Sequence, residues 1–250
     1  MTRMLARELL TQQRLFWRSY EAAFFTFALP ILFLLLLGSV YGDEEIDGVR
    51  GSTFLLAGLL GYGVVATAFA GLAITLVVRR ESGVLKRVRG TPLPTSVYLA
   101  AVIASTLVVV ALEVIVQLLV GRYVIDADWP ASPASLAFAL LLGSVAFATL
   151  GLAVTAVVRS AEGSSAVINA IYLPLSFASG VFFSVDSLPG FLQAIATVSP
   201  LTYLLDLVRG EFIEGRTLAD GGTEIAVLVG WGLVGLVVAL RWFHWEPREA

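Results

Sequence analysis

The sequence predicts an all-α membrane protein with six transmembrane helices, and two observations support this. Of its 250 residues, 58% are hydrophobic and 14% are charged, and the mean hydropathy is +0.89, whereas roughly a quarter of the residues in a soluble protein are charged. The apolar residues also form runs of roughly twenty, the length of helix that crosses a bilayer core about 30 Å thick. The six runs cover residues 22–41, 53–78, 98–120, 135–158, 166–185 and 225–243. A soluble globular protein is therefore excluded, and we expect one membrane domain over residues 1–250.

The basic residues fall mainly on one side of these spans. Of the 16 Lys and Arg residues, twelve lie in the N-terminal segment, in the loops after the second and fourth spans, and around the C-terminus. The opposite side has most of the acidic residues and only four basic ones, Arg50, Arg122, Arg209 and Arg216. Because Lys and Arg near span ends mark the cytoplasmic side of a membrane, we expect both termini in the cytoplasm.

Residues 1–21 predict an amphipathic helix ahead of the first span. At about 100° per residue, apolar side chains form one face and arginines lie opposite. The apolar face consists of Leu5, Leu9, Leu10, Phe16, Trp17 and Tyr20, and the basic residues are Arg3, Arg7, Arg14 and Arg18. Such a helix is suited to lie along a membrane surface, so we expect an interfacial helix on the cytoplasmic side. The alternative is that the arginines only hold the N-terminus in the cytoplasm.

The second and fourth spans have related sequences. Residues 63–79 read GVVATAFAGLAITLVVR and residues 143–159 read GSVAFATLGLAVTAVVR, so that eleven of the seventeen positions are identical. Small residues recur on one helical face in both copies, which permits a close approach between helices in a membrane. Either similar packing requirements on two helices or an old duplication would explain the similarity.

The cytoplasmic loops after these two spans contain candidate docking residues. Residues 79–97 begin RRESGVLKRVRGTPLPT, which predicts a short cationic helix that ends at Gly90, Pro92 and Pro94 in a rigid turn. We interpret this loop as a docking element, and the alternative is an anchor that only fixes the topology. The second loop, residues 159–163, reads RSAEG and again places a basic residue, an acid and a glycine at a helix junction.

Residues 186–223 predict an unusual segment on the outer side. Pro189 suits the first position of a short helix, the dipeptide Ser199–Pro200 interrupts it, and a second helix follows. Residues 188–208 are too apolar for a free loop and too broken for a full span. We therefore expect a re-entrant helical hairpin in the outer leaflet between the fifth and sixth spans, with its backbone covered by protein or a cavity.

Glu113 is the charged residue that lies inside an apolar run, about 10 Å from the outer end of the third span. A charge at such a depth costs on the order of 3 kcal/mol, so the carboxyl group should be protonated, paired or turned toward a cavity. Gln117, one turn later, shares its helical face. One interpretation is a polar patch that binds substrate or links two subunits, and the other is a side chain that reaches to the outer interface.

The composition excludes several kinds of chemistry. The chain has no cysteine and one histidine, His244, so we expect no metal site, disulfide, thiol catalysis or histidine-dependent hydrolysis. The only lysine, Lys86, follows Leu85 rather than the glycine that a phosphate loop requires. The net charge of −3 does not suggest a nucleic-acid partner. We expect no catalytic residues and no nucleotide site in this chain.

Taken together, the amphipathic N-terminus, the R-R-E-x-G-x-L-K-R-x-R-x-T-P-L-P loop, the R-x-x-E-G loop, and S-G-V-F-F followed by L-P and S-P-L-T-Y resemble the ABC-2 type export permeases, in particular the daunorubicin-resistance-like multidrug export branch. The resemblance covers nearly the whole chain. It implies a permease subunit in a prokaryotic cytoplasmic membrane, paired with a second copy of itself or a close homologue. It also implies two copies of a separate ABC ATPase subunit, which bind ATP and Mg and hydrolyse the ATP.

The resemblance also implies roles for individual residues. The family's ATPase-coupling contacts correspond to Arg80, Glu81, Gly83, Lys86, Arg87 and Glu162. A substrate path between the two copies, lined partly by the second and fifth spans, would include Glu113, Gln117, Asn169 and Tyr172. The outer gate would include Phe182, Phe183, Pro200 and Tyr203. We expect the substrates to be amphipathic drugs or lipids, exported from the cytoplasm or the inner leaflet, with polysaccharide or glycolipid export as the alternative.

Two other classes of function remain as alternatives. An ion-coupled carrier that works alone usually needs several charged residues near the membrane midplane, and this chain has essentially one. An intramembrane enzyme, such as a lipid transferase, needs clustered carboxylates or a nucleophile with its base, and the sequence contains no such cluster. Both are therefore less well supported than an ATP-driven exporter subunit.

Overall fold

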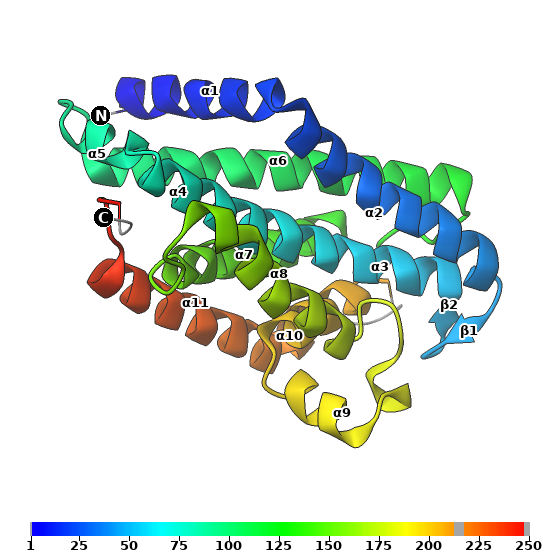
Figure 1. Cartoon of the computed structure of the whole chain (residues 1–250). Helices are drawn as coiled ribbons and strands as arrows, with labels where there is room; N and C mark the ends of the chain where they lie inside the picture. The colour runs from blue at the N-terminus through cyan, green and yellow to red at the C-terminus, as the bar shows by residue number, and fades with distance from the viewer. Residues whose placement is uncertain (1, 213–217, 248–250) are drawn as a thin grey trace.

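We describe the protein from a computed structural model that places residues 2–212 and 218–247. Residue 1, residues 213–217 and residues 248–250 lie outside the described residues, and with them Arg216, Arg248 and part of the predicted outer segment 186–223. The described chain is mostly helical, and its long helices pack as one bundle (Figure 1). This agrees with the predicted all-α membrane class.

The helices follow one another along the chain with short connections. Their bounds are α1 Thr2–Arg18, α2 Tyr20–Tyr41, α3 Gly51–Val64, η1 Val65–Gly71, α4 Leu72–Glu81, α5 Val84–Arg89, α6 Thr95–Val124, α7 Pro133–Val154, α8 Ala161–Ala178, η2 Val185–Ser187, α9 Gly190–Ala196, α10 Pro200–Gly210, η3 Leu218–Gly221 and α11 Gly222–Trp242. A small antiparallel hairpin, β1 Glu45–Ile46 and β2 Val49–Arg50, joins α2 to α3 and pairs Glu45 with Arg50.

Five helical stretches of the described residues are long and apolar enough to cross a membrane. They are Tyr20–Tyr41, Gly51–Glu81, Thr95–Val124, Pro133–Val154 and Gly222–Trp242. The bent pair of α9 and α10 is a sixth candidate if it counts as one span, with an angle of 80° between its halves. This bend is compatible with a broken span and with a re-entrant hairpin, so the predicted hairpin stays a prediction.

The predicted fifth span, residues 166–185, differs most from the observed helix. Helix α8 begins earlier, at Ala161, and ends at Ala178, because the chain turns at Gly180 in the left-handed region with φ +88°. Its polar first turns exclude α8 from the five apolar stretches described above. The bounds of the other predicted spans differ from the observed helices by a few residues, and the 30-residue α6 extends beyond 98–120 at both ends.

The core of the bundle is the stretch Gly51–Glu81, which consists of α3, η1 and α4 and which we call the central helix. All 14 residues of α3 are buried, and the central helix contacts α2, α6, α7, α8 and α10. Glycines let these neighbours approach closely. A Cβ on Gly58 would lie 2.0 Å from the backbone oxygen of Val181, so only glycine fits there.

The two related sequences form two helices that touch. Residues 63–79 belong to the central helix, and residues 143–159 form α7 and its C-terminal end. A Cβ on Gly151 would lie 2.8 Å from the carbonyl oxygen of Phe69, so the small residue permits backbone contact between the copies. The repeated glycine therefore has a packing role in this structure, whatever its origin.

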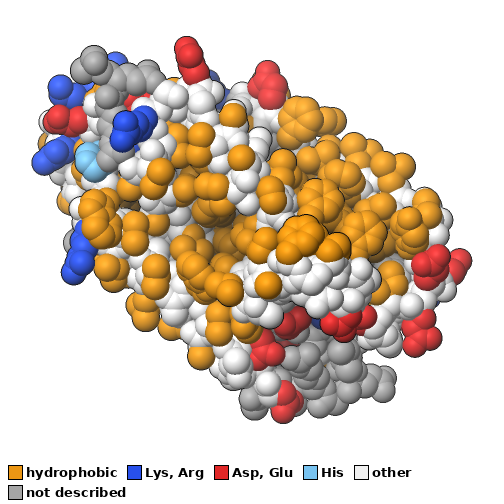
Figure 2. All heavy atoms as spheres, turned by 60° about the horizontal axis from the view of Figure 1, so that its bottom comes forward, with side chains coloured by type: hydrophobic (Ala, Val, Ile, Leu, Met, Phe, Trp, Pro, Cys, Tyr) orange, Lys and Arg blue, Asp and Glu red, His pale blue; other side chains and the backbone are white. Residues whose placement is uncertain are grey.

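Basic and acidic side chains are unevenly distributed along the bundle axis. In Figure 2 the visible Lys, Arg and His side chains lie at one end, apolar side chains cover the middle, and acidic side chains gather toward the other end, with a few beside the basic end. The start of α1, α5 and the end of the described chain share the basic end (Figure 1), where the Trp245 ring lies 6.4 Å from that of Tyr98. The cytoplasmic placement of this end stays a prediction.

Candidate functional site

A buried polar cluster lies between the central helix and α6. Glu113 is 2% exposed and Gln117 is 1% exposed. Thr67 Oγ1 donates a hydrogen bond to Glu113 Oε2 at 3.0 Å, and Gln117 Nε2 donates to Glu113 Oε1 at 3.1 Å. A Cβ on Gly63 would lie 2.4 Å from Glu113 Oε1, so the glycine leaves the space that the carboxyl group occupies. The cluster is therefore bound to the chain's own central helix, and the Glu113 side chain does not extend to the outer interface.

The central helix is irregular where it meets this cluster. Thr67 belongs to η1, a π-helical segment of 7 residues between α3 and α4. Such segments are rare, widen the helix by one residue per turn, and occur frequently at functional sites. Here the π-helical segment presents Thr67 to Glu113 and joins the fully buried α3 to the more exposed α4.

An aromatic cluster lies beside α3, the first part of the central helix. The ring of Phe182 lies 5.7 Å from that of Phe33, 6.1 Å from that of Tyr62 and 5.2 Å from that of Phe177. The Tyr172 ring is 6.2 Å from Tyr62. These side chains come from α2, α3, α8 and the loop after α8. The structure therefore brings together Tyr172 of the predicted path and Phe182 of the predicted gate.

The other predicted path and gate residues are more dispersed. Asn169 is half-buried on α8, whereas Glu113 and Gln117 lie on α6. Phe183 is 49% exposed and adjoins Tyr41 at the outer end.

The last two predicted gate residues lie on α10, the second half of the bent pair. Pro200 is buried at the start of α10. The Tyr203 hydroxyl donates to the carbonyl oxygen of Thr197 at 2.8 Å, and this bond spans the bend between α9 and α10.

Two of the predicted coupling residues are buried. Arg80 is 1% exposed and donates through Nη1 to the carbonyl oxygen of Thr155 at 2.7 Å and through Nη2 to that of Val158 at 2.6 Å. Its Nε donates to Glu81 Oε1 at 2.5 Å, and the side chains of this ion pair are 2% and 4% exposed. The carbonyls at the C-terminal end of a helix lack intrahelical partners. Arg80 therefore fastens the end of α4 to the end of α7, a link that we call the Arg80 latch.

The other coupling residues are available on the surface. Gly83 has φ +71° and joins α4 to α5, and a Cβ on it would contact nothing within 4 Å. On α5, Leu85 is fully buried, whereas Lys86 and Arg87 are exposed. Glu162 is exposed in the first turn of α8, next to the Ser160 cap, whose Oγ accepts from the Gly163 backbone at 3.1 Å. The exposed surface at this end of the bundle thus includes Lys86, Arg87 and Glu162.

Three residues that the prediction did not assign to a site make important contacts. Tyr62 joins the aromatic cluster, and Thr67 holds Glu113. Arg209 donates through Nη2 to the carbonyl oxygen of Gly180, and its guanidinium carbon lies 3.8 Å from the centre of the Phe54 ring. The sequence signal for Arg209 was weaker than that for Glu113, because Arg209 follows the apolar residues 188–208 and lies between Asp206 and Glu211.

Replacing Glu113 with glutamine tests whether an ionisable group is needed in the polar cluster. Gln117 Oε1 has no hydrogen-bond partner among the described residues, so the Gln117 amide can turn and accept from the new amide. We expect the free energy of unfolding of the Glu113→Gln protein to stay within about 1 kcal/mol of the wild-type value, and we expect its transport activity to be lost. Thr67→Ser, which keeps the hydroxyl, is the matched control for Thr67→Val, which removes it. Unchanged transport and substrate range in the well-expressed Glu113→Gln protein would show that the ionisable group has no functional role.

Comparison with known proteins places the chain in a family. The model of the family described as ABC-2 type transporter matches residues 3–213. The inner membrane transport permease YadH of Escherichia coli K12 is 25% identical over 221 residues, which are 86% of this chain and 81% of YadH. The putative transport permease YvfS of Bacillus subtilis is 23% identical over 83% of this chain and 86% of its own length. Nodulation protein J of Rhizobium leguminosarum bv. viciae is 28% identical over 84% and 82%, respectively. The chain therefore belongs to the family of ABC-2 type transporters, as its sequence motifs predicted.

Proposed function

We propose that this protein is the transmembrane permease of an ATP-driven exporter, and that a separate ABC ATPase subunit binds and hydrolyses ATP with Mg. The main support is the family match over residues 3–213, together with an exposed cationic helix, α5, held at the end of the bundle that carries most of the basic residues. The chain itself contains no phosphate loop. A second subunit is therefore the source of the chemical energy in this proposal.

Helix α5 is suited to dock in a groove on such a subunit. Leu85 fixes it against the bundle, while Lys86 and Arg87 project from it. The short distance from α5 to the Arg80 latch means that a displacement of α5 pulls on α4 and α7 together. The coupling residues then have two roles: Lys86, Arg87 and Glu162 contact the ATPase, and Arg80 with Glu81 transmits the movement.

The proposed substrate path lies between two copies of the permease. Helix α2 packs on the outer half of the central helix, and α8 packs on its inner half. Both leave large apolar side chains exposed, for example Phe24 and Leu36 on α2 and Ile171 and Phe177 on α8. Apolar walls with a few polar anchors suit an amphipathic drug or lipid, moved out of the cytoplasm or the inner leaflet. We place the cytosolic end at α5, in the cytoplasmic membrane of a prokaryote.

The experiment that tests this function measures ATP hydrolysis by the permease reconstituted with its ATPase, with a panel of drugs, lipids and glycans. We expect Lys86→Glu/Arg87→Glu to reduce substrate-stimulated hydrolysis at least about tenfold, because a like charge at a contact costs several kcal/mol and 1.4 kcal/mol is a factor of ten. Arg241→Glu is the control, because this exposed arginine ends α11 at the same end of the bundle. Full stimulation in the α5 double variant would refute the docking assignment. Stimulation by glycans alone would replace the proposed substrate class.

A further inference from the structure

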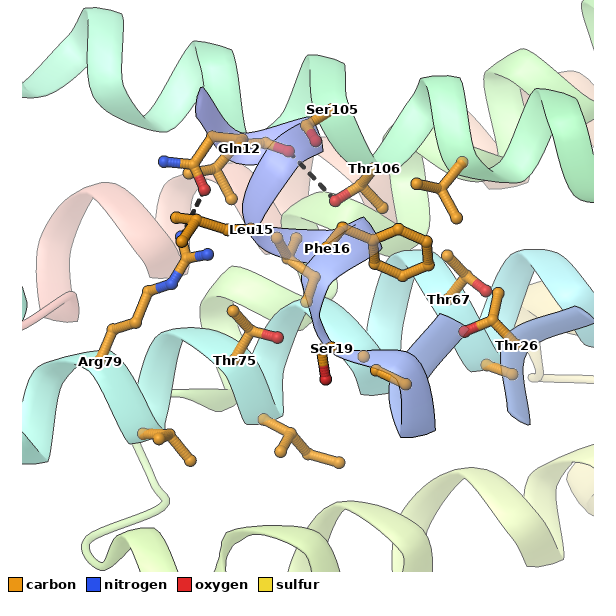
Figure 3. Close-up of a pocket in the computed structure, with 18 residues that line it drawn as sticks. Gln12, Leu15, Phe16, Ser19, Thr26, Thr67, Thr75, Arg79, Ser105 and Thr106 are labelled. Carbon is orange, nitrogen blue, oxygen red and sulfur yellow. Dashed lines mark hydrogen bonds between the residues drawn. The ribbon is translucent and has the colours of Figure 1, made fainter. Parts of the chain in front are cut away.

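We infer that each permease chain binds the anionic headgroup and one acyl chain of an acidic phospholipid in a pocket between α1, the start of α2, the central helix and α6. This site lies within a single chain and differs from the proposed path between two copies. It does not depend on which molecule the transporter moves. Figure 3 shows the pocket, with Arg79 and Gln12 at one end and Thr67 and Thr26 at the other.

The size of the pocket fits a small amphiphile. Its volume is about 400 Å³, within the roughly 300–1,000 Å³ of small-molecule sites. The wall formed by the central helix extends from Thr67 to Arg79, a length of roughly 15 Å at the rise of a helix. The pocket is therefore long enough for a headgroup at one end and a length of acyl chain behind it.

The charge of the pocket favours an anion. Its described lining contains one cation, Arg79, and no Asp or Glu. Arg79 Nη1 donates to Gln12 Oε1 at 2.6 Å and to the Tyr98 hydroxyl at 3.1 Å, both of which are neutral groups. The nearby Glu8 carboxylate accepts from Gln12 Nε2 at 2.6 Å and does not line the pocket. Within residues 2–212 and 218–247, no carboxylate forms an ion pair with Arg79. A half-buried guanidinium with only neutral partners retains donors for a phosphate group, the geometry that arginine recognises well.

The remaining lining residues fit the part of an acyl chain that lies next to the lipid headgroup. Phe16 from α1 reaches between the helices (Figure 3), and Ile74, Val102 and Val109 supply apolar surface. Hydroxyl groups of Thr75 and Thr106 lie among them, as expected near the glycerol region rather than deep in a bilayer.

The surroundings of the pocket identify a lipid as the source of the anion. Side chains around it are both apolar and exposed: Leu15 is 47% exposed, Trp17 44% and Val78 43%. Exposed apolar residues of this kind, beside a basic amphipathic helix, contact a membrane interface rather than water. An acidic phospholipid supplies the anion and the chain together, whereas a free phosphate ion supplies only the anion.

The test measures lipid binding to the delipidated permease alone, by native mass spectrometry, with phosphatidylglycerol, phosphatidylcholine and inorganic phosphate as probes. We expect phosphatidylglycerol to bind at least about tenfold more tightly than phosphatidylcholine, which corresponds to about 1.4 kcal/mol. Arg79→Gln should remove this preference, and Arg79→Lys should retain part of it. Arg89→Gln removes an exposed charge from α5 and should leave binding unchanged.

A second variant separates binding from folding. Thr75→Phe fills the pocket and leaves Arg79, Gln12 and Tyr98 in place, so we expect it to weaken phosphatidylglycerol binding about tenfold while the protein stays monodisperse. Equal binding of the two lipids, or wild-type binding by both Arg79→Gln and Thr75→Phe, would overturn the proposal. Inorganic phosphate that binds as tightly as phosphatidylglycerol, and requires Arg79, would also overturn it in favour of a simple anion site. Because no ATPase is present, these results are independent of the proposed transport function.

Discussion

Replacing Arg80 with alanine is expected to abolish coupled transport and to destabilise the permease by about 3–5 kcal/mol, the usual cost of removing one partner from a buried ion pair. The substitution leaves the buried Glu81 without its arginine and removes the donors to Thr155 and Val158. The ends of α4 and α7 then lose the Arg80 latch. Thermal unfolding in detergent and ATP-driven transport are the two measurements.

Two controls distinguish the loss of the Arg80 latch from the loss of a positive charge in general. Arg89→Ala removes an exposed arginine from α5 and should change stability by no more than about 0.5 kcal/mol. Glu81→Ala should reproduce part of the Arg80→Ala defect, since it leaves a buried guanidinium without its carboxylate. A fully stable and coupled Arg80→Ala protein would show that the latch has no role in coupling.

Replacing Gly58 with alanine is expected to displace the loop after α8 and to disrupt the aromatic cluster. A Cβ would lie 2.0 Å from the backbone oxygen and 3.0 Å from the carbonyl carbon of Val181, and backbone atoms cannot rotate away as a side chain can. Overpacking in a core costs about 1–3 kcal/mol and occasionally more, and we expect at least the upper end here. Phe182 follows Val181, so transport should fall together with the thermal unfolding midpoint.

Gly230 provides the matched control for Gly58. It lies within α11, where a Cβ would contact nothing within 4 Å, and alanine is favoured over glycine in a helix by about 1 kcal/mol. Gly230→Ala should therefore be neutral or slightly stabilising. Equal stability of Gly58→Ala and Gly230→Ala proteins would contradict the packing described for the loop after α8.

The membrane class and the approximate positions of most helices could be predicted from the apolar runs. The end of α8 could not, because the apolar sequence continues through residues 179–183 while the backbone turns at Gly180. Hydropathy reports the solvent that a segment requires, and it does not report the backbone angle of one glycine. Hydropathy also could not predict the π-helical segment η1, because its composition is that of an ordinary membrane span.

The arrangement of the candidate site residues could not be predicted from the sequence. The family resemblance implied that Arg80, Glu81, Lys86 and Arg87 all contact the ATPase. In the structure α4 continues to Glu81, and its helical phase turns Arg80 toward α7 instead. Likewise, Glu113 and Tyr172 lie on different helices, α6 and α8, and each contacts the central helix. These placements depend on which helices become neighbours, and a single sequence does not specify that.

The most direct test of an ATP-driven permease is transport into inside-out proteoliposomes that contain the permease with or without its ATPase. A fluorescent amphiphile is added outside, and its accumulation is followed with ATP, without ATP, and with an imposed ion gradient. We predict accumulation that requires both ATP and the ATPase subunit and that is lost in Lys86→Glu/Arg87→Glu but kept in Arg241→Glu. Accumulation by the permease alone under an ion gradient would contradict this account and would identify an ion-coupled carrier.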